Sequence, residues 1–114
     1  MATLYTRTYN LKDSLNDQEV LESWRFTMEE VIPAVQKVPG VSSLKVYSGA
    51  GALRADLTIL VEMDDAAAYE RLLLDPQVRK HLGRLYGYWD LKTAGQSFRR
   101  EVTLELIRAL SSTG

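Results

Sequence analysis

The sequence contains one histidine, His81, and histidine is the side chain best suited to proton transfer near neutral pH. Val78, Leu82 and Leu85 surround it at helical spacing. His81 is therefore predicted to point toward the sheet, or toward the rim of a cavity beneath the helix. There it could hold an acidic substrate group or take its proton. The simpler interpretation is a partly buried helical side chain with no catalytic role.

Aromatic side chains form the second group of candidate site residues. The candidates for the walls of a ligand pocket are Tyr9, Trp24, Tyr69, Tyr86 and Trp89. Such rings suit a flat, hydrophobic or aromatic molecule. Trp24 and Tyr69 also fit amphipathic stripes as ordinary core residues. The aromatic residues between 86 and 89 fall in an expected loop, which is predicted to close the cavity beside His81.

Several other kinds of site are excluded by residue type or spacing. The chain has no cysteine, which removes thiolate metal sites and disulfides. There is no second histidine, no phosphate-binding glycine loop and no spacing that supports a Ser-His-Asp triad. We therefore predict no metal and no cofactor.

Charge gives no indication of a nucleic-acid partner. The net charge is −1, and the basic residues Arg79, Lys80 and Arg84 are explained by a solvated helix face. The segment 53–63 is expected to be a strand, and it has no aromatic residue on which a base could stack. The first ten residues lack a secretory pattern and no apolar run could span a bilayer, so a cytoplasmic protein without membrane contact is expected.

The elements that must position these residues are organised around a predicted β-hairpin, Val41–Met63. Its tip is expected at Gly49, Ala50 and Gly51. In the second strand, one face carries Leu53, Ala55, Leu57, Ile59, Val61 and Met63. A period of two places these side chains on the same side of a sheet, which helices must cover.

A strand and a helix precede the hairpin. In the strand Thr3–Leu11, one face has Tyr5, Arg7, Tyr9 and Leu11, and the sequence leaves open which face is buried. A helix is predicted over Asp17–Lys37, starting with a capping box at Asn16 and Glu19. Its predicted buried stripe is Leu21, Trp24, Met28, Val31, Val35 and Val38. Pro33 should kink this helix or end its regular part early.

Two shorter helices and a strand follow the hairpin. The first is predicted over Ala66–Leu74 with Asp64 or Asp65 as its cap, and the second starts at Asp75-Pro76 and ends near Leu85. The last strand is predicted over Ser97–Ile107. Residues 1–107 are thus expected to form one domain, and residues 108–114 a frayed tail.

This order of elements predicts an α+β, ferredoxin-like βαββαβ fold with a four-stranded antiparallel sheet and helices on one face. The other face is expected to carry Lys45, Tyr47, Arg54, Asp56, Thr58, Leu60, Thr103, Glu105 and Ile107. It is neither uniformly polar nor strongly charged. A second copy of the sheet is predicted to dock there, which would make a homodimer.

Three segments make the chain similar to the dimeric α+β barrel superfamily. RTYNLKDS, at 7–14, resembles the first strand of NIPSNAP-like and stress-responsive A/B-barrel domains. VPGVSSLKVY, at 38–47, resembles the passage from the first helix to the second strand. LTILVEMDDAAAYERLLLDPQVRKHL, at 57–82, looks like the segment with the third strand and second helix in antibiotic-biosynthesis-monooxygenase-type domains.

The resemblance implies functions of several kinds. The superfamily includes cofactor-free quinol monooxygenases, muconolactone isomerase and haem-degrading enzymes. His81 is placed like the haem ligand of the last group, but Thr6 and Arg71 stand where that group has an asparagine and a tryptophan. The first hypothesis is a homodimer that binds a small hydrophobic molecule, as a cofactor-free monooxygenase or isomerase. The alternative is a non-catalytic binding and dimerisation domain, with haem binding as a weaker third.

Overall fold

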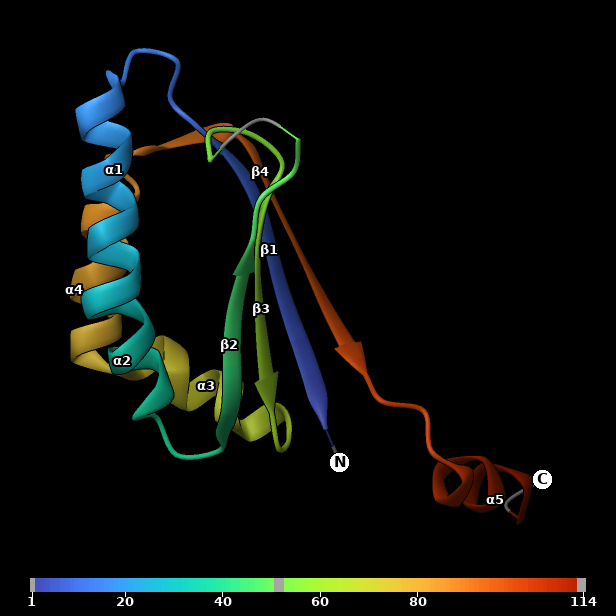
Figure 1. Ribbon diagram of the computed structural model, residues 1–114. Coiled ribbons are helices and arrows are strands. Elements are labelled where there is room, and N and C mark those ends of the chain that lie inside the picture. The colour runs from blue at the N-terminus through green and yellow to red at the C-terminus, as the bar shows by residue number, and fades with distance from the viewer. Residues whose placement is uncertain (1, 51–52, 113–114) are drawn as a thin grey trace.

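The computed structural model describes residues 2–50 and 53–112 and has the predicted α+β architecture (Figure 1). In chain order the elements are β1 (Thr3–Leu11), α1 (Asp17–Phe26), the π-helix η1 (Thr27–Val31), α2 (Ile32–Gln36), β2 (Val41–Tyr47), β3 (Leu57–Met63), α3 (Ala66–Leu74), α4 (Pro76–Leu85), β4 (Trp89–Arg100) and α5 (Leu104–Ser112). In the described part of the chain, the strands form one four-stranded antiparallel sheet in the order β2-β3-β1-β4. Helices α1 to α4 lie on one side of it, which confirms the ferredoxin-like fold.

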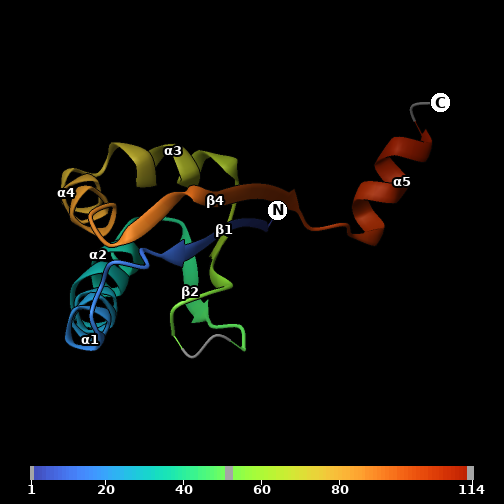
Figure 2. The ribbon, with the colours of Figure 1, turned by 90° about the horizontal axis from the view of Figure 1, so that it is seen from above.

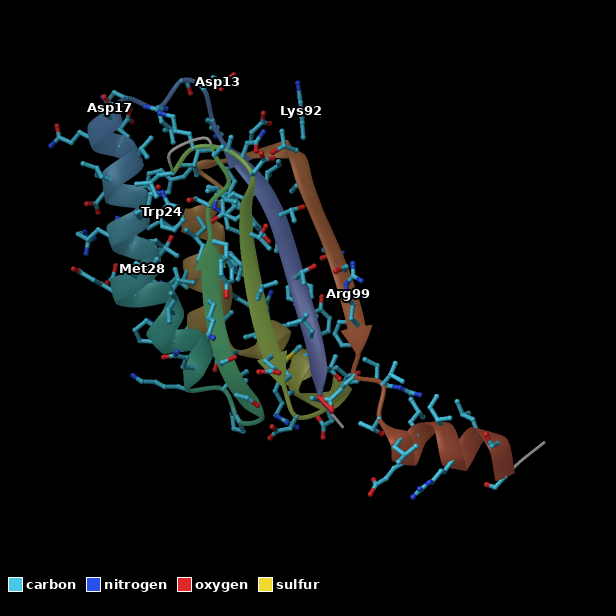
Figure 3. All side chains as sticks on the ribbon, turned by 45° about the vertical axis from the view of Figure 1, so that its right-hand side comes forward. Asp13, Asp17, Trp24, Met28, Lys92 and Arg99 are labelled. Carbon is cyan, nitrogen blue, oxygen red and sulfur yellow. The ribbon has the colours of Figure 1, made fainter. Side chains whose placement is uncertain are left out.

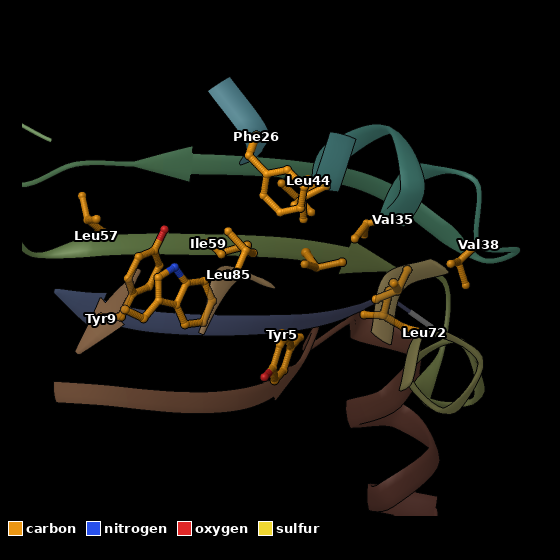
Figure 4. Close-up of a cluster of buried hydrophobic side chains, with 14 of the residues drawn as sticks. Tyr5, Tyr9, Phe26, Val35, Val38, Leu44, Leu57, Ile59, Leu72 and Leu85 are labelled. Carbon is orange, nitrogen blue, oxygen red and sulfur yellow. The ribbon is translucent and has the colours of Figure 1, made fainter. Parts of the chain in front are cut away.

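The central strand β1 turns one of its two faces to the core. The buried-side residues are Tyr5, Arg7, Tyr9 and Leu11. Tyr5 pairs across the sheet with Val61, and Tyr9 pairs with Leu57. The side chains of these two tyrosines and of their two partners on β3 are buried. Figure 4 shows the two tyrosine rings on the same layer as the aliphatic residues of β3. The question that the sequence left open is thus decided by pairing with the apolar face of β3.

The first helical segment begins as predicted but changes type in the middle. Asn16 Oδ1 accepts from the Glu19 amide at 2.8 Å, and Glu19 Oε1 accepts from the Asn16 amide at 2.9 Å, which completes the capping box. The π-helical turn η1 follows, in which the Ile32 amide donates to the Thr27 carbonyl. Pro33 lies one residue further and has no amide hydrogen to donate. The expected disturbance at this proline therefore takes the form of a wider turn just before it.

This π-helical turn changes which residues of α1 and η1 face the core. Leu21 and Met28, predicted to be buried, are 61% and 47% exposed. The buried residues upstream are Val20, Ser23, Phe26 and Thr27. A π-helical turn takes up about one residue more than an α-helical turn, so the stripe moves by one position. The prediction was wrong here because it extended the period of 3.6 residues through η1.

The helices α3 and α4 start at their predicted caps. Asp65 accepts from the Ala68 amide at 3.1 Å, and Asp75 accepts from the Val78 amide at 2.9 Å. Asp64, the alternative cap, instead accepts from the Ser42 hydroxyl. Short-range sequence patterns were sufficient for these boundaries because each cap depends on residues only three positions apart.

The hairpin is confirmed, but its second strand is shorter than predicted. β3 starts at Leu57, so Leu53 and Ala55 belong to the connection rather than to the apolar face. Leu53 and Asp56 have positive φ angles of 75° and 54°, which interrupts the extended backbone that a strand requires. Gly51 of the predicted tip lies outside the described residues.

The C-terminal third departs most from prediction. β4 starts at Trp89, which is 1% exposed and pairs with Leu11, and it ends at Arg100. The predicted strand over 97–107 is therefore wrong beyond Arg100. Five residues placed on the outer sheet face lie elsewhere: Arg54, Asp56, Thr103, Glu105 and Ile107. Strand registers place on that face Leu4, Thr6, Thr8, Lys45, Tyr47, Thr58, Leu60, Ser97 and Arg99.

The helix α5 occupies the segment where a strand end and a frayed tail were predicted. It lies apart from the sheet and the other helices in both views (Figures 1 and 2). The radius of gyration is 16.2 Å, against about 13 Å for a compact chain of this length. Leu104 and Ile107 are 63% and 48% exposed. None of the described helices is both long enough and apolar enough to cross a membrane.

Candidate functional site

A small cavity lies between the sheet and the helical layer, where η1, α2, α3 and α4 border it. It holds about 60 Å³ and borders nearly every element of the body. Aliphatic side chains make up most of its wall, among them Leu44, Ile59, Leu72, Val78 and Leu85. Figure 4 shows Leu44, Ile59, Leu72 and Leu85 around this region. The polar members of the wall are therefore few, and each has a defined position.

Two tyrosines contribute phenol groups at one side of this cavity. The Tyr5 and Tyr69 ring centroids are 5.0 Å apart, and the Tyr5 hydroxyl donates to Gln96 Oε1 at 2.9 Å. Burial raises the pKa of Tyr5, and the nearby Arg7 guanidinium partly opposes that shift. A phenol hydroxyl can both donate and accept a hydrogen bond, so these two side chains give the cavity wall hydrogen-bonding capacity.

Arg7 also lines the cavity, from the middle of β1. Its guanidinium carbon lies 5.3 Å from the Tyr86 ring centroid and 5.4 Å from the Trp89 ring centroid. Trp89 is itself fixed by stacking on Tyr9 at 3.9 Å. Aromatic faces attract a cation, so these rings hold the guanidinium in a set orientation.

Tyr5 and Tyr69 also border a second, wider hollow. Its other wall residues are Gln96, Ser97 and Phe98 of β4, and its volume is about 450 Å³. Phe98 is 46% exposed and packs edge-on against Tyr69. Because the two tyrosines belong to both walls, they separate a small inner cavity from an open outer hollow.

His81 lies elsewhere. Its ring is 9% exposed and packs edge-on against Phe26, with 5.2 Å between centroids. The Gln77 side-chain amide donates to His81 Nε2 at 3.1 Å. The hollow that it borders is lined by Glu29, Glu30, Pro33, Ala34, Lys37, Asp75 and Gln77. His81 and the aromatic cluster therefore do not line one cavity, because the histidine faces η1 and α2 rather than the sheet.

The surroundings of His81 do not fit a haem group. A haem needs a flat apolar slot with an open position on the histidine. Here the ring is held between Phe26 and Gln77, and charged side chains of both signs border the hollow. Among the described residues, no three His, Cys, Asp or Glu side chains are grouped so that they could hold a metal ion.

The other predicted pocket residues divide into three groups. Tyr69 and Trp89 line the inner cavity directly. Tyr9 and Tyr86 support it from behind, since each ring packs against Trp89. Trp24 on α1 (Figure 3) is separate from all of them, because its indole nitrogen donates to the carbonyl of Leu53, in the connection between β2 and β3, at 2.9 Å.

Comparison with solved structures supports the fold. A dimeric protein with a ferredoxin-like fold from Bacteroides fragilis is 12% identical, with a TM-score of 0.73 over 88% of this chain and 96% of the other. The fold is that of such ferredoxin-like proteins. SnoaB, a cofactor-independent oxygenase from Streptomyces nogalater, is 13% identical, with a TM-score of 0.67 over 90% of this chain and 96% of its own.

A third neighbour is a dimeric ferredoxin-like protein from Thermobifida fusca, 13% identical, with a TM-score of 0.70 over 89% of this chain and 92% of the other. The predicted resemblance is confirmed in that antibiotic-biosynthesis-monooxygenase-type proteins are among the structural neighbours. No protein-family model matches this sequence. A comparison with curated proteins finds no match either.

Sequence reasoning missed Tyr5 and Arg7 as site residues. Both belong to the alternating set on β1, whose orientation the sequence left open. The available indication was an arginine between two tyrosines on one strand face. Burying an arginine in a core is unfavourable unless its guanidinium interacts with a polar or charged group.

Proposed function

We propose that this protein binds a small, mainly hydrophobic or aromatic molecule in the inner cavity. One observation carries the proposal: a mainly aliphatic cavity whose lining also includes two tyrosines and one arginine. Ligand sites in proteins combine an apolar lining with a few fixed polar groups in this way. The inner cavity is small, so the ligand is either small or displaces Tyr5 and Tyr69 to extend into the outer hollow.

Ligand binding can be tested by methyl NMR with a panel of single-ring aromatic compounds. We expect shifts at Leu72, Val78 and Leu85, which line the cavity, and none at Leu21, which is exposed on α1. Shifts spread evenly over exposed and cavity methyl groups would contradict a defined site.

A second candidate function adds catalysis to the same site. The fold similarity to SnoaB, a cofactor-independent oxygenase, favours oxygenation of a bound aromatic compound over isomerisation. The test is oxygen consumption with a hydroquinone in the presence of a metal chelator. Consumption that is lost in Tyr5→Phe or Tyr69→Phe supports catalysis in the cavity. Binding without consumption supports the non-catalytic alternative.

We also propose that the protein is a homodimer that packs through the outer sheet face. That face carries the apolar groups of Leu4, Tyr47 and Leu60, and neighbours of the same fold are described as dimeric. Obligate dimers bury on the order of 2,000 Å² or more. Sedimentation should show a dimer at micromolar concentration, which Leu60→Asp weakens because it places an unpaired charge in the interface. The control is Gln18→Asp on α1, and a stable monomer would contradict the proposal.

A further inference from the structure

We propose that the ligand of the inner cavity carries a carboxylate, which the guanidinium of Arg7 binds. This inference rests on the proposed ligand-binding function and specifies the chemical class of the ligand: a small hydrophobic organic acid. Three features of the described residues carry it.

The first feature is that this positive charge has no carboxylate partner among the described residues, although it lies beside the Tyr5 hydroxyl. Arg7 is partly buried, and it is the one charged side chain among those that line the cavity in the described structure. The ion pairs found among the described residues involve Arg25, Arg54, Arg71 and Arg84, and none involves Arg7. A cation in an apolar wall is unfavourable unless an anion or water reaches it. A ligand carboxylate would supply that anion.

The second feature appears when Arg7 is compared with Arg84, which also lies over an aromatic ring. The Arg84 guanidinium carbon is 4.1 Å from the Phe26 centroid, and its nitrogens lie 3.4 Å from Glu22 and 4.0 Å from Glu30. The protein thus provides carboxylates for the arginine that borders solvent. Among the residues that the structure describes, it provides none for Arg7, which borders the cavity.

The third feature is orientation. Tyr86 and Trp89 lie within 5.4 Å of the Arg7 guanidinium carbon, and Trp89 is held in turn by Tyr9. A guanidinium that is held in place loses less conformational entropy when its planar fork binds the two oxygens of a carboxylate. The aliphatic wall and Tyr69 can then accommodate the hydrocarbon part of the same molecule.

An acid with one aromatic ring must use both hollows and enter between the two tyrosines, because the inner cavity alone is too small for the ring. The inner cavity holds about 60 Å³ and the outer hollow about 450 Å³, with Tyr5 and Tyr69 between them. A ligand with a single aromatic ring would therefore extend from Arg7 toward the outer hollow. Neither hollow has an acidic side chain in its wall to repel the carboxylate.

The test uses a matched pair of probes, phenylacetate and phenylacetamide, which differ in charge but hardly in shape. Dissociation constants are measured by NMR titration of wild type, Arg7→Met and the control Arg84→Met. We expect wild type to bind phenylacetate at least about tenfold more tightly than phenylacetamide, the size typical of one charge-assisted contact. Arg7→Met should lose this preference, and Arg84→Met should retain it.

The outcomes separate this inference from the proposed function. Equal affinity for both probes in wild type, with shifts at cavity methyl groups, would overturn the carboxylate inference and leave a hydrophobic binding site. Binding of neither probe would overturn both. A preference that survives in Arg7→Met would also overturn the inference, because another group would then bind the carboxylate. Proton spectra of each variant confirm that it is folded.

Discussion

The two hollows that border chemically versatile residues differ in what surrounds them. The inner cavity has aliphatic and aromatic walls and one cation, Arg7, with no carboxylate. The hollow at His81 has Glu29, Glu30, Lys37 and Asp75 in its wall, so charges of both signs are already present. His81 itself is used for packing on Phe26 and for a hydrogen bond to Gln77.

This difference shows that residue type is a weaker guide to a site than the surroundings of the residue. Histidine is the more versatile side chain, but here its ring is engaged by protein groups on two sides. Arginine has only one charge state, yet at Arg7 the described residues provide neutral partners and no carboxylate. The following predictions test this contrast between a structural histidine and a ligand-binding arginine.

The largest effect is expected at Trp89, which supports Arg7 and fills the core. Trp89→Ala should lower the free energy of unfolding by about 3–5 kcal/mol, because it removes a 1% exposed ring that stacks on Tyr9. Urea denaturation measures this. Leu91→Ala, on the same strand but 51% exposed, is the control and should change stability by about 0.5 kcal/mol or less. A similar small loss in both variants would mean that the aromatic wall is not part of the core.

The next effect concerns the tyrosines of the cavity region at alkaline pH. Burial raises the pKa of Tyr9 above its usual value, and it raises that of Tyr5 as well. A raised pKa favours the neutral phenol in the folded state, so its stabilising contribution is complete below about pH 10, the pKa of an unfolded tyrosine. Above that pH, stability should fall by up to about 1.4 kcal/mol per pH unit for each such group. Urea denaturation at a series of pH values measures this, and the free energy of unfolding of Tyr9→Phe should fall less steeply with pH than that of wild type. An unchanged slope would contradict a raised pKa at Tyr9.

His81→Ala should lower the free energy of unfolding by about 1–3 kcal/mol, because the ring is buried against Phe26. It should leave the affinity for phenylacetate within about twofold, since His81 is not in the wall of the inner cavity. Denaturation and NMR titration together measure both effects. Loss of binding in a variant that remains folded would reverse the contrast and restore the histidine as a site residue.

Arg7→Met should give the opposite combination. Its stability should differ from wild type by about 1 kcal/mol or less, because methionine retains the apolar stem and no ion pair is broken. Chemical denaturation at neutral pH is the measurement. A loss of several kcal/mol would show that the guanidinium stabilises the fold, and the ligand would no longer be needed to explain its position.

Much of the fold could be predicted because its determinants are local. Asn16, Asp65 and Asp75 cap their helices through contacts three residues away, and the alternation in β3 marks its buried face. The orientation of β1, and with it the placement of Arg7, depends on strand pairing between distant segments. The start of β4 likewise depends on Trp89 stacking on Tyr9 across the sheet. Tertiary contacts of this kind leave no fixed spacing in the sequence.

The smallest effect is expected on the outer side of α1, where the π-helical turn changed the buried stripe. η1 places Phe26 against His81 and turns Leu21 outward, where it is 61% exposed. Leu21→Ser should therefore change the free energy of unfolding by about 0.5 kcal/mol or less. The neighbouring Val20 is 5% exposed, and Val20→Ala should cost roughly 2 kcal/mol for two buried carbons and the space they leave. A larger loss for Leu21→Ser than for Val20→Ala would mean that the helix follows the regular period and that His81 faces a different partner.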